Sequence, residues 1–242
     1  MLNNFDPTIL LKLFRFLRTV DLKQVSCTNK YLSGYARYSM GYKRRVIVKS
    51  IDSIPKFANV HNLYVRGGIS SIDGLPPNLQ ILKIMGENTI SSIDELPSSL
   101  QYLEIFGYNT ISSVDGLPPN LHTLKIWGEN RISFINRLPS NLEVLQIYGD
   151  NTISSIDELP SSLQYLEISG RNKISSVDRL PSSLKVLQIF GDNLISSIDR
   201  LPPNLQVLKI WGENTISSID RFPSSLEVLE IMGENGISSI DR

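Results

Sequence analysis

The residues of this sequence that could do chemistry are two histidines and a regularly spaced set of aspartates. His61 and His122 are the only histidines, and neither has a cysteine or a second histidine at a spacing that binds zinc. The aspartates recur with a common period, and carboxylates stacked in such a column could recruit calcium. The column consists of Asp52, Asp73, Asp94, Asp115, Asp157, Asp178, Asp199, Asp220 and Asp241.

A structural role accounts for the same residues. Each aspartate except Asp241 stands in a short polar stretch shortly before a proline, where its carboxylate can accept hydrogen bonds from turn amides, and Asn136 in the same column can also accept. Paired serines such as Ser91 and Ser92 are typical of turns. Gly-x-Ser-x-Gly, Walker and His-Glu-x-x-His motifs do not occur in the sequence. We therefore expect no catalytic residues, metal or cofactor, with calcium binding as the alternative for the aspartates.

Large side chains that follow a short apolar stretch form a second candidate site. They recur with the same period and include both tryptophans of the chain. Large aromatic groups on an outward face are typical of protein interfaces, and a small residue among them leaves a notch for a bulky side chain of a target. The alternative is that the rings only stack on one another and stabilise the fold. The candidate target-binding residues are Phe106, Trp127, Tyr148, Ser169, Phe190 and Trp211.

A repeat of 21 residues must position these side chains. The unit reads Pro-(Ser/Pro)-(Ser/Asn)-Leu-x-x-Leu-x-Ile-x-Gly-x-Asn-x-Ile-Ser-Ser-Ile-Asp-x-Leu, as in residues 97–117. Strict spacing of this kind is the signature of a solenoid. The period is marked by Pro55, Pro76, Pro97, Pro118, Pro139, Pro160, Pro181, Pro202 and Pro223.

The spacing within the unit predicts one short strand per coil. Leu-x-Ile alternates with period two and is followed by glycine, which favours a strand of three to five residues, and coils stacked in one direction make the strands parallel. One coil buries too little apolar surface to fold alone, so neighbouring coils must stabilise one another. Gly at the strand end predicts a positive φ or a close approach between coils, and the Asn two residues later predicts an amide ladder. The predicted inward residues of one unit are Leu100, Leu103, Ile105, Ile111, Val114 and Leu117.

The run Leu-x-x-Leu-x-Ile-x-Gly-x-Asn-x-Ile resembles a leucine-rich repeat, with the Asn one place later than usual. The longer run Leu-Pro-Ser-Ser-Leu-x-x-Leu-x-Ile-x-Gly resembles more closely the FNIP repeats known from social amoebae and giant viruses. The Phe and Pro of that family's naming tetrapeptide are replaced here by the stretch at residues 86–90. The resemblance covers about four-fifths of the chain.

The N-terminal part of the chain differs in charge and in pattern. Residues 1–50 hold ten of the 24 basic side chains and two of the 24 acidic ones, so they carry a net charge of +8 and the remainder carries −8. Apolar residues from Ile9 to Leu17 follow helical spacing after Asp6, which predicts a helix with Asp6 as its N-cap, and two shorter helices are predicted after it. The cations alternate with this apolar stripe and form no long run, so nucleic acid is disfavoured as a partner.

Residues 4–42 resemble an F-box, with Pro7 one place late and Tyr31 where a Trp is common. F-box proteins commonly carry this motif before a recognition repeat. The resemblance implies that the segment docks on the linker protein that joins a cullin. The alternative is a helical cap that only seals the first coil. The implied linker-binding residues are Phe5, Pro7, Ile9, Leu10, Leu13, Phe14, Leu17 and Leu22.

These observations predict an α+β class, with a short N-terminal helical F-box followed by a leucine-rich-repeat-like solenoid with one parallel β-sheet. The expected domains are residues 1–45, the F-box-like helical segment; 46–75, a capping strand and a degraded first repeat; and 76–242, eight repeats of which the last is one residue short.

The predicted function is that of a non-catalytic substrate-recognition adaptor of a cullin-RING ubiquitin ligase. Its partners would be the linker protein, the cullin and an unknown target protein bound by the sheet face. The alternative is a scaffold outside any ligase whose N-terminal segment is only a cap. The single cysteine, Cys27, cannot form an internal disulfide, and the first apolar stretch is too short and too charged to cross a bilayer. We therefore expect an intracellular protein of the cytoplasm or nucleus, in a host cell if it is viral, with no membrane partner.

Overall fold

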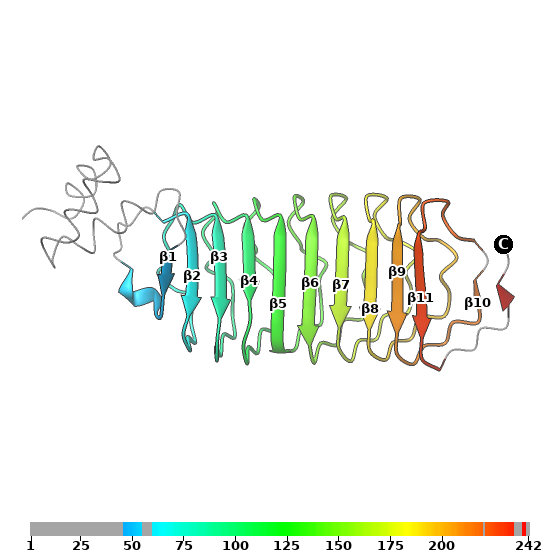
Figure 1. Cartoon of the computed structure of the whole chain (residues 1–242), viewed down its shortest axis with the longest axis horizontal. Helices are drawn as coiled ribbons and strands as arrows, with labels where there is room; N and C mark the ends of the chain where they lie inside the picture. Colours follow the sequence, from blue (N-terminus) through cyan, green and yellow to red (C-terminus); the bar gives the residue numbers. More distant parts are fainter. Residues whose placement is uncertain (1–45, 55–59, 220, 235–238, 241–242) are drawn as a thin grey trace, which may run out of the picture.

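The structure is a computed structural model that describes residues 46–54, 60–219, 221–234 and 239–240. Ten strands lie side by side and point the same way in one parallel sheet (Figure 1), ordered along the chain except that β11 follows β9. A second sheet pairs the short strands β10 and β12. The strands are β1 (Val46–Val48), β2 (Asn62–Arg66), β3 (Ile81–Met85), β4 (Tyr102–Ile105), β5 (Thr123–Asn130), β6 (Val144–Gly149), β7 (Tyr165–Ser169), β8 (Val186–Phe190), β9 (Val207–Trp211), β10 (Ser218–Ile219), β11 (Val228–Met232) and β12 (Ser239–Ile240).

Each coil begins with a turn that the proline sets. In the coil of β4 the carbonyl oxygen of Pro97 accepts a hydrogen bond from the amide of Leu100 at 3.0 Å, and each later coil has the same bond. The chain then enters the strand, where Leu103 and Ile105 point inward with no exposed surface. From β3 to β11 the register pairs residues 21 positions apart, such as Leu82 with Leu103. The repeat period therefore equals the length of one coil, as the sequence predicts.

The apolar core is a single column enclosed by the coils. The six inward residues predicted for residues 97–117 all lie in it, with at most 9% of any residue exposed. Ile111 and Val114 come from the stretch that returns the chain to the next strand, opposite Leu103 and Ile105 of the strand itself. Both sides of the coil thus bury apolar side chains against each other, and the outward side chains of the strands are left on the surface of the sheet.

The predicted α+β class is wrong for the part of the chain that the structure describes, which is all-β. No α-helix occurs in residues 46–54, 60–219, 221–234 and 239–240, where the only helical element is one 3-10 turn at Ile51–Ser53. Ile and Ser in the return stretch are weak helix formers. Its backbone bonds instead to the neighbouring coil, as when the amide of Thr110 donates to the Ile90 oxygen at 2.9 Å. The F-box-like helical segment expected at residues 1–45 lies outside the described residues.

The first coils are shorter than the later ones. Leu63 of β2 pairs with Leu82, 19 positions along, and Val46 of β1 pairs with Leu63, 17 positions along. Val60, Leu63 and Val65 are nevertheless fully buried, so the shortened coil keeps the same core. β1 occupies the place predicted for a capping strand and forms one edge of the sheet.

In each coil from β3 to β11 a glycine stands two residues after the second inward residue of the strand, where neighbouring coils come close. Gly128 has a φ of 147°, and a Cβ atom on it would lie 2.6 Å from the carbonyl oxygen of Gly107 in the preceding coil. Such contact distances are not found for real Cβ atoms. The prediction of positive φ and close approach at this position is confirmed.

The asparagine two residues later joins three coils. Asn130 is fully buried, its Oδ1 accepts from the amide of Ile111 at 3.2 Å, and its Nδ2 donates to the Tyr148 oxygen at 3.0 Å. Asn88, Asn109 and Asn151 make the same pair of bonds. The predicted amide ladder is therefore present from Asn88 to Asn151. It is incomplete in the following coils, where Nδ2 of Asn172 and Oδ1 of Asn193 and Asn214 have no hydrogen-bond partner within the described residues.

Candidate binding face

The outward side chains of β3 to β11 form three parallel columns on one face, because residues of a strand alternate between core and surface. We call this surface the outer face. The first column holds Ile81, Tyr102, Thr123, Val144, Tyr165, Val186, Val207 and Val228. The polar column holds Lys83, Glu104, Lys125, Gln146, Glu167, Gln188, Lys209 and Glu230. The aromatic column holds Met85, Phe106, Trp127, Tyr148, Ser169, Phe190, Trp211 and Met232.

Three successive rings of the aromatic column stack on one another. The ring centroids of Phe106 and Trp127 are 4.1 Å apart with an interplanar angle of 5°, and those of Trp127 and Tyr148 are 5.5 Å apart at 13°. All three residues are half-buried. The faces of Trp127 are therefore largely occupied by its neighbours, so part of what this column does is structural.

The stack is interrupted at Ser169 and differs beyond it. Phe190 and Trp211 have centroids 5.0 Å apart, but their planes are tilted by 59°. Trp211 is 39% exposed, more than the other candidate target-binding residues. The structure thus places the six predicted residues in one row, with a continuous stack on one side of Ser169 and a looser pair on the other.

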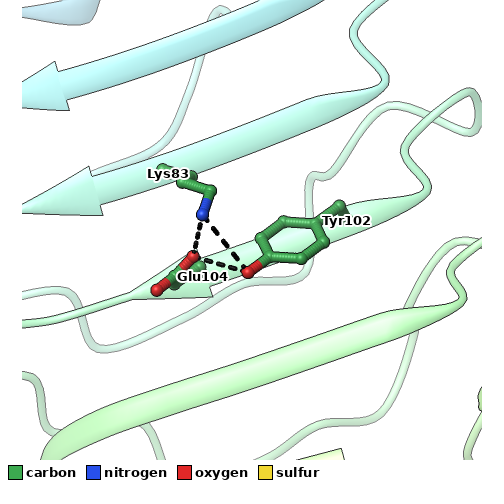
Figure 2. A network of polar contacts seen from close by, with 3 residues as sticks. All are labelled: Lys83, Tyr102 and Glu104. Atoms are coloured by element: carbon green, nitrogen blue, oxygen red, sulfur yellow. Dashed lines mark hydrogen bonds and ion pairs between the residues drawn. The ribbon is translucent and has the colours of Figure 1, made fainter. Parts of the chain in front are cut away.

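The polar column contains a compact network around Glu104, which is 8% exposed. Figure 2 shows that the ammonium group of Lys83 and the phenol of Tyr102 converge on the Glu104 carboxylate. Lys83 Nζ lies 2.5 Å from Glu104 Oε2, and the Tyr102 hydroxyl donates to the same oxygen at 2.6 Å. Lys83 also donates to the Tyr102 hydroxyl at 3.3 Å.

This network shifts the pKa of each member. Burial alone would raise the pKa of Glu104, but the hydrogen bonds from Lys83 and Tyr102 outweigh it and lower the pKa below its ordinary value. Burial alone would lower the pKa of Lys83, yet its bonds to Glu104 and Tyr102 raise it. The pKa of Tyr102 is raised by burial and by its bond to Glu104. The network is thus a stable ion pair with a protonated phenol, and it fixes these side chains on the outer face.

A second network surrounds Glu167, which is 6% exposed. Its carboxylate accepts from the hydroxyl of Tyr148, from the hydroxyl of Tyr165 at 2.8 Å and from Nε2 of Gln146 at 2.5 Å. Burial, followed by the bond to Glu167, raises the pKa of Tyr165 to about 12 and raises that of Tyr148 as well. Both phenols therefore stay protonated at neutral pH and act as donors.

Neither network was predicted from the sequence. The alternation of Lys and Glu in the polar column was a visible signal for the first, since stacked coils place opposite charges side by side. The second network depends on Tyr148 reaching across to the next coil, which no spacing in the sequence reveals.

The aspartate column forms turns with its serines. Ser92 accepts a hydrogen bond from the amide of Asp94 at 3.2 Å, and its hydroxyl donates to the Asp94 carboxylate at 2.7 Å. The serine, and not the aspartate carboxylate, is thus the group that accepts the turn amide. Within the described residues, no group of three or more His, Cys, Asp or Glu side chains is placed to hold a metal ion. His61 and His122 lie in separate coils, before β2 and β5.

The predicted linker-binding residues are not among those that the structure describes. They are Phe5, Pro7, Ile9, Leu10, Leu13, Phe14, Leu17 and Leu22. Their role stays a prediction from the sequence.

The comparisons with known proteins identify the fold. CroV588, described as a novel circular LRR protein, is 19% identical with a TM-score of 0.55; the match covers 76% of this chain and 32% of that one. A Shigella effector LRR domain is 28% identical over 72% of this chain and 68% of its own, with a TM-score of 0.48. The leucine-rich repeat domain of APL1B is 16% identical over 88% and 85%, also with a TM-score of 0.48.

The chain therefore has the fold of a leucine-rich-repeat solenoid, an assignment that rests on CroV588. It spans about a third of the length of that protein. No protein-family model matches the sequence, and no curated protein matches it. The resemblances to F-box and FNIP sequences thus rest on the residues quoted for them. In the part of the chain that is described, no helix has the length and apolar character needed to cross a membrane.

Proposed function

We propose that this chain binds a protein target along the outer face and catalyses no reaction. The observation that carries the proposal is the aromatic column, which places five rings and two methionines in one row on a sheet. Large apolar side chains on a surface are costly unless something covers them, and Trp and Tyr are enriched among the residues that dominate binding energy at interfaces. The rigid support of the coils would let the face bind without reordering.

A target would bury most additional apolar surface at the end of the aromatic column that holds Trp211 and Met232, because these side chains are the more exposed ones. The rings of Phe106, Trp127 and Tyr148 already cover one another, whereas Trp211 is 39% exposed and Met232 is 53% exposed. Covering Trp211 on binding would bury apolar surface that the fold leaves in water. We therefore expect Trp211 to contribute more to binding than its stacked counterpart Trp127.

Affinity capture with the full chain, followed by titration of the purified target, tests this proposal. Trp211→Ala should weaken binding about 30-fold, which corresponds to about 2 kcal/mol. Phe134→Ala is a matched control, because Phe134 is 66% exposed and belongs to the return stretch and not to the outer face. Equal affinities of the two variants for the target would refute the outer face as the binding surface.

We further propose that the target is delivered to a cullin-RING ubiquitin ligase inside a cell. The support for this finer assignment is the resemblance of residues 4–42 to an F-box, together with its place before a repeat domain. Pulldown of the linker protein and cullin is the test. The double variant Leu10→Asp, Leu13→Asp should lose both partners and keep the circular dichroism of the sheet. Linker binding that survives removal of residues 1–42 would exclude this docking segment and favour a scaffold outside any ligase.

A further inference from the structure

Ser169 stands where the other coils between β4 and β9 supply a ring to the aromatic column, and it separates Tyr148 from Phe190. In the continuous part of the column each coil supplies one ring, and successive centroids are 4.1 and 5.5 Å apart. Tyr148 and Phe190 flank Ser169 and lie two coils apart, roughly 9.6 Å by the usual strand spacing. A planar group seated above Ser169 would therefore lie at stacking distance from a ring on each side.

The carboxylate beside this gap has no cation. Glu167 precedes Ser169 by two residues on β7 and faces the same side of the sheet. The other two carboxylates of the polar column form ion pairs, Glu104 with Lys83 at 2.5 Å and Glu230 with Lys209 at 2.9 Å. Among the described residues none forms an ion pair with Glu167, whose neighbours in the column are Gln146 and Gln188.

Hydrogen-bond acceptors also outnumber donors here. Glu167 takes its three bonds from neutral groups, two of them phenols whose raised pKa keeps them protonated. Gln146 uses its N–H on Glu167, and its Oε1 has no hydrogen-bond partner within the described part of the chain. A buried acceptor without a partner costs free energy that an added donor would recover. A ligand group that is cationic, planar and rich in hydrogen-bond donors would therefore complement the surface around Ser169 and Glu167.

A guanidinium group meets all three requirements. It is always charged, presents five N–H donors in a plane, and stacks on aromatic rings. A lysine ammonium supplies the charge but no plane to stack, and an aromatic side chain supplies the plane but no charge. We propose that the gap at Ser169 is a recognition slot for an arginine side chain of the protein target. The guanidinium stacks between Tyr148 and Phe190 and donates to the Glu167 carboxylate.

This inference rests on the proposed function, because it names the side chain that the outer face recognises. The probe is a random peptide library displayed on phage and selected on the full chain. The selected peptides should share an arginine, and replacing it with citrulline, a neutral group of the same shape, should weaken binding about tenfold or more. Selected peptides that share instead a lysine, an aromatic residue or no common residue would overturn the slot.

Variants of the chain locate the arginine. Glu167→Gln should lower the affinity for arginine peptides about tenfold, so that they bind no more tightly than the citrulline peptides. Glu104→Gln removes a carboxylate of the same column and should leave the preference for arginine over citrulline unchanged. Ser169→Phe should place a ring between Tyr148 and Phe190. The thermal midpoint of unfolding should then be unchanged or higher, and arginine peptides should no longer bind at this position. An arginine-to-citrulline ratio that is unchanged in Glu167→Gln overturns the slot.

The same experiment separates the two proposals. Peptides that lose binding in Trp211→Ala but show no preference for arginine would leave the outer face as the binding surface and remove only the arginine slot. If no selected peptide depends on Trp211, both the proposed face and the slot are wrong. Circular dichroism of each variant establishes that the sheet is intact.

Discussion

Trp127 and Trp211 occupy equivalent positions four coils apart, and the structure predicts that they contribute differently to stability. Trp127 is stacked on both sides, against Phe106 and Tyr148. Trp211 has one ring neighbour, Phe190, at a tilt of 59°, and is 39% exposed. Replacement by alanine removes two stacking contacts at the first position and one poorer contact at the second.

The magnitudes follow from the number of contacts. An aromatic pair contributes about 0.5–1.5 kcal/mol beyond the burial of its surface. Trp127→Ala should therefore lower the free energy of unfolding by about 2–3 kcal/mol once some lost burial is added, and Trp211→Ala by about 1 kcal/mol. Phe134→Ala should change it by no more than about 0.5 kcal/mol, since that ring is 66% exposed.

Urea denaturation followed by far-ultraviolet circular dichroism measures these differences without relying on the fluorescence of the tryptophans that are replaced. The slope of each transition must agree between variants, because repeat proteins can lose cooperativity and a changed slope would mix two effects. If Trp127→Ala proved no more destabilising than Phe134→Ala, the stack would have no structural role, and the aromatic column would serve binding alone.

Three further predictions concern the coil and the polar column. Asn130→Ala removes two bonds from a fully buried position and should cost about 2 kcal/mol or more in urea denaturation. Gly149→Ala would place a Cβ atom 2.6 Å from the nearest carbonyl oxygen, at a φ of 141° that side chains rarely adopt. Gly116→Ala has a milder positive φ of 74° and meets no atom within 4 Å, so the first should lower the urea midpoint clearly more than the second. The pKa of Glu104 is lowered in the folded state, so the stability it contributes is present above the ordinary value of 4.5 and is lost as the pH falls through its folded-state value. Glu104→Gln should therefore make the thermal midpoint less dependent on pH on the acid side.

The coil itself could be predicted from the sequence because its determinants are local and repeated. The alternation of Leu103 and Ile105 sets the strand, the proline sets the turn before it, and a glycine is required where two backbones meet. Because the pattern recurs in eight repeats, each inference is independent of any one residue. The predicted core of residues 97–117 is accordingly the core that the structure shows.

The α+β class failed for a different reason. It joined a helical pattern at residues 9–17 to the solenoid as if both belonged to one fold class, although only the solenoid carries a repeated signal. Nothing in the return stretch favours a helix, since Ile90 and Ile111 bond to residues of neighbouring coils. The described fold is all-β because the backbone bonds run between coils.

The sequence predicts which residues of the candidate site share a column, but it does not predict which of their side chains contact one another. The period identifies which residues share a column, so Phe106 to Trp211 could be placed on one face. It does not show that Tyr148 reaches Glu167 in the next coil, or that the ring of Trp211 is tilted against Phe190. Those features depend on side-chain rotamers, and the rotamer in one coil depends on the rotamers in the adjacent coils.

The difference between the two carboxylate networks follows from the sequence of the polar column alone. Glu104 lies between Lys83 and Lys125, so its charge is neutralised within the solenoid. Glu167 occupies the same position three coils further along and lies between two glutamines, so the column supplies no cation beside it. Substitution of Gln146 by lysine should therefore supply the missing cation in the chain itself, stabilise the fold and close the slot to an arginine of the target. Retained arginine binding in Gln146→Lys, with Glu167 paired to the new lysine, would mean that the guanidinium is recognised by another part of the outer face.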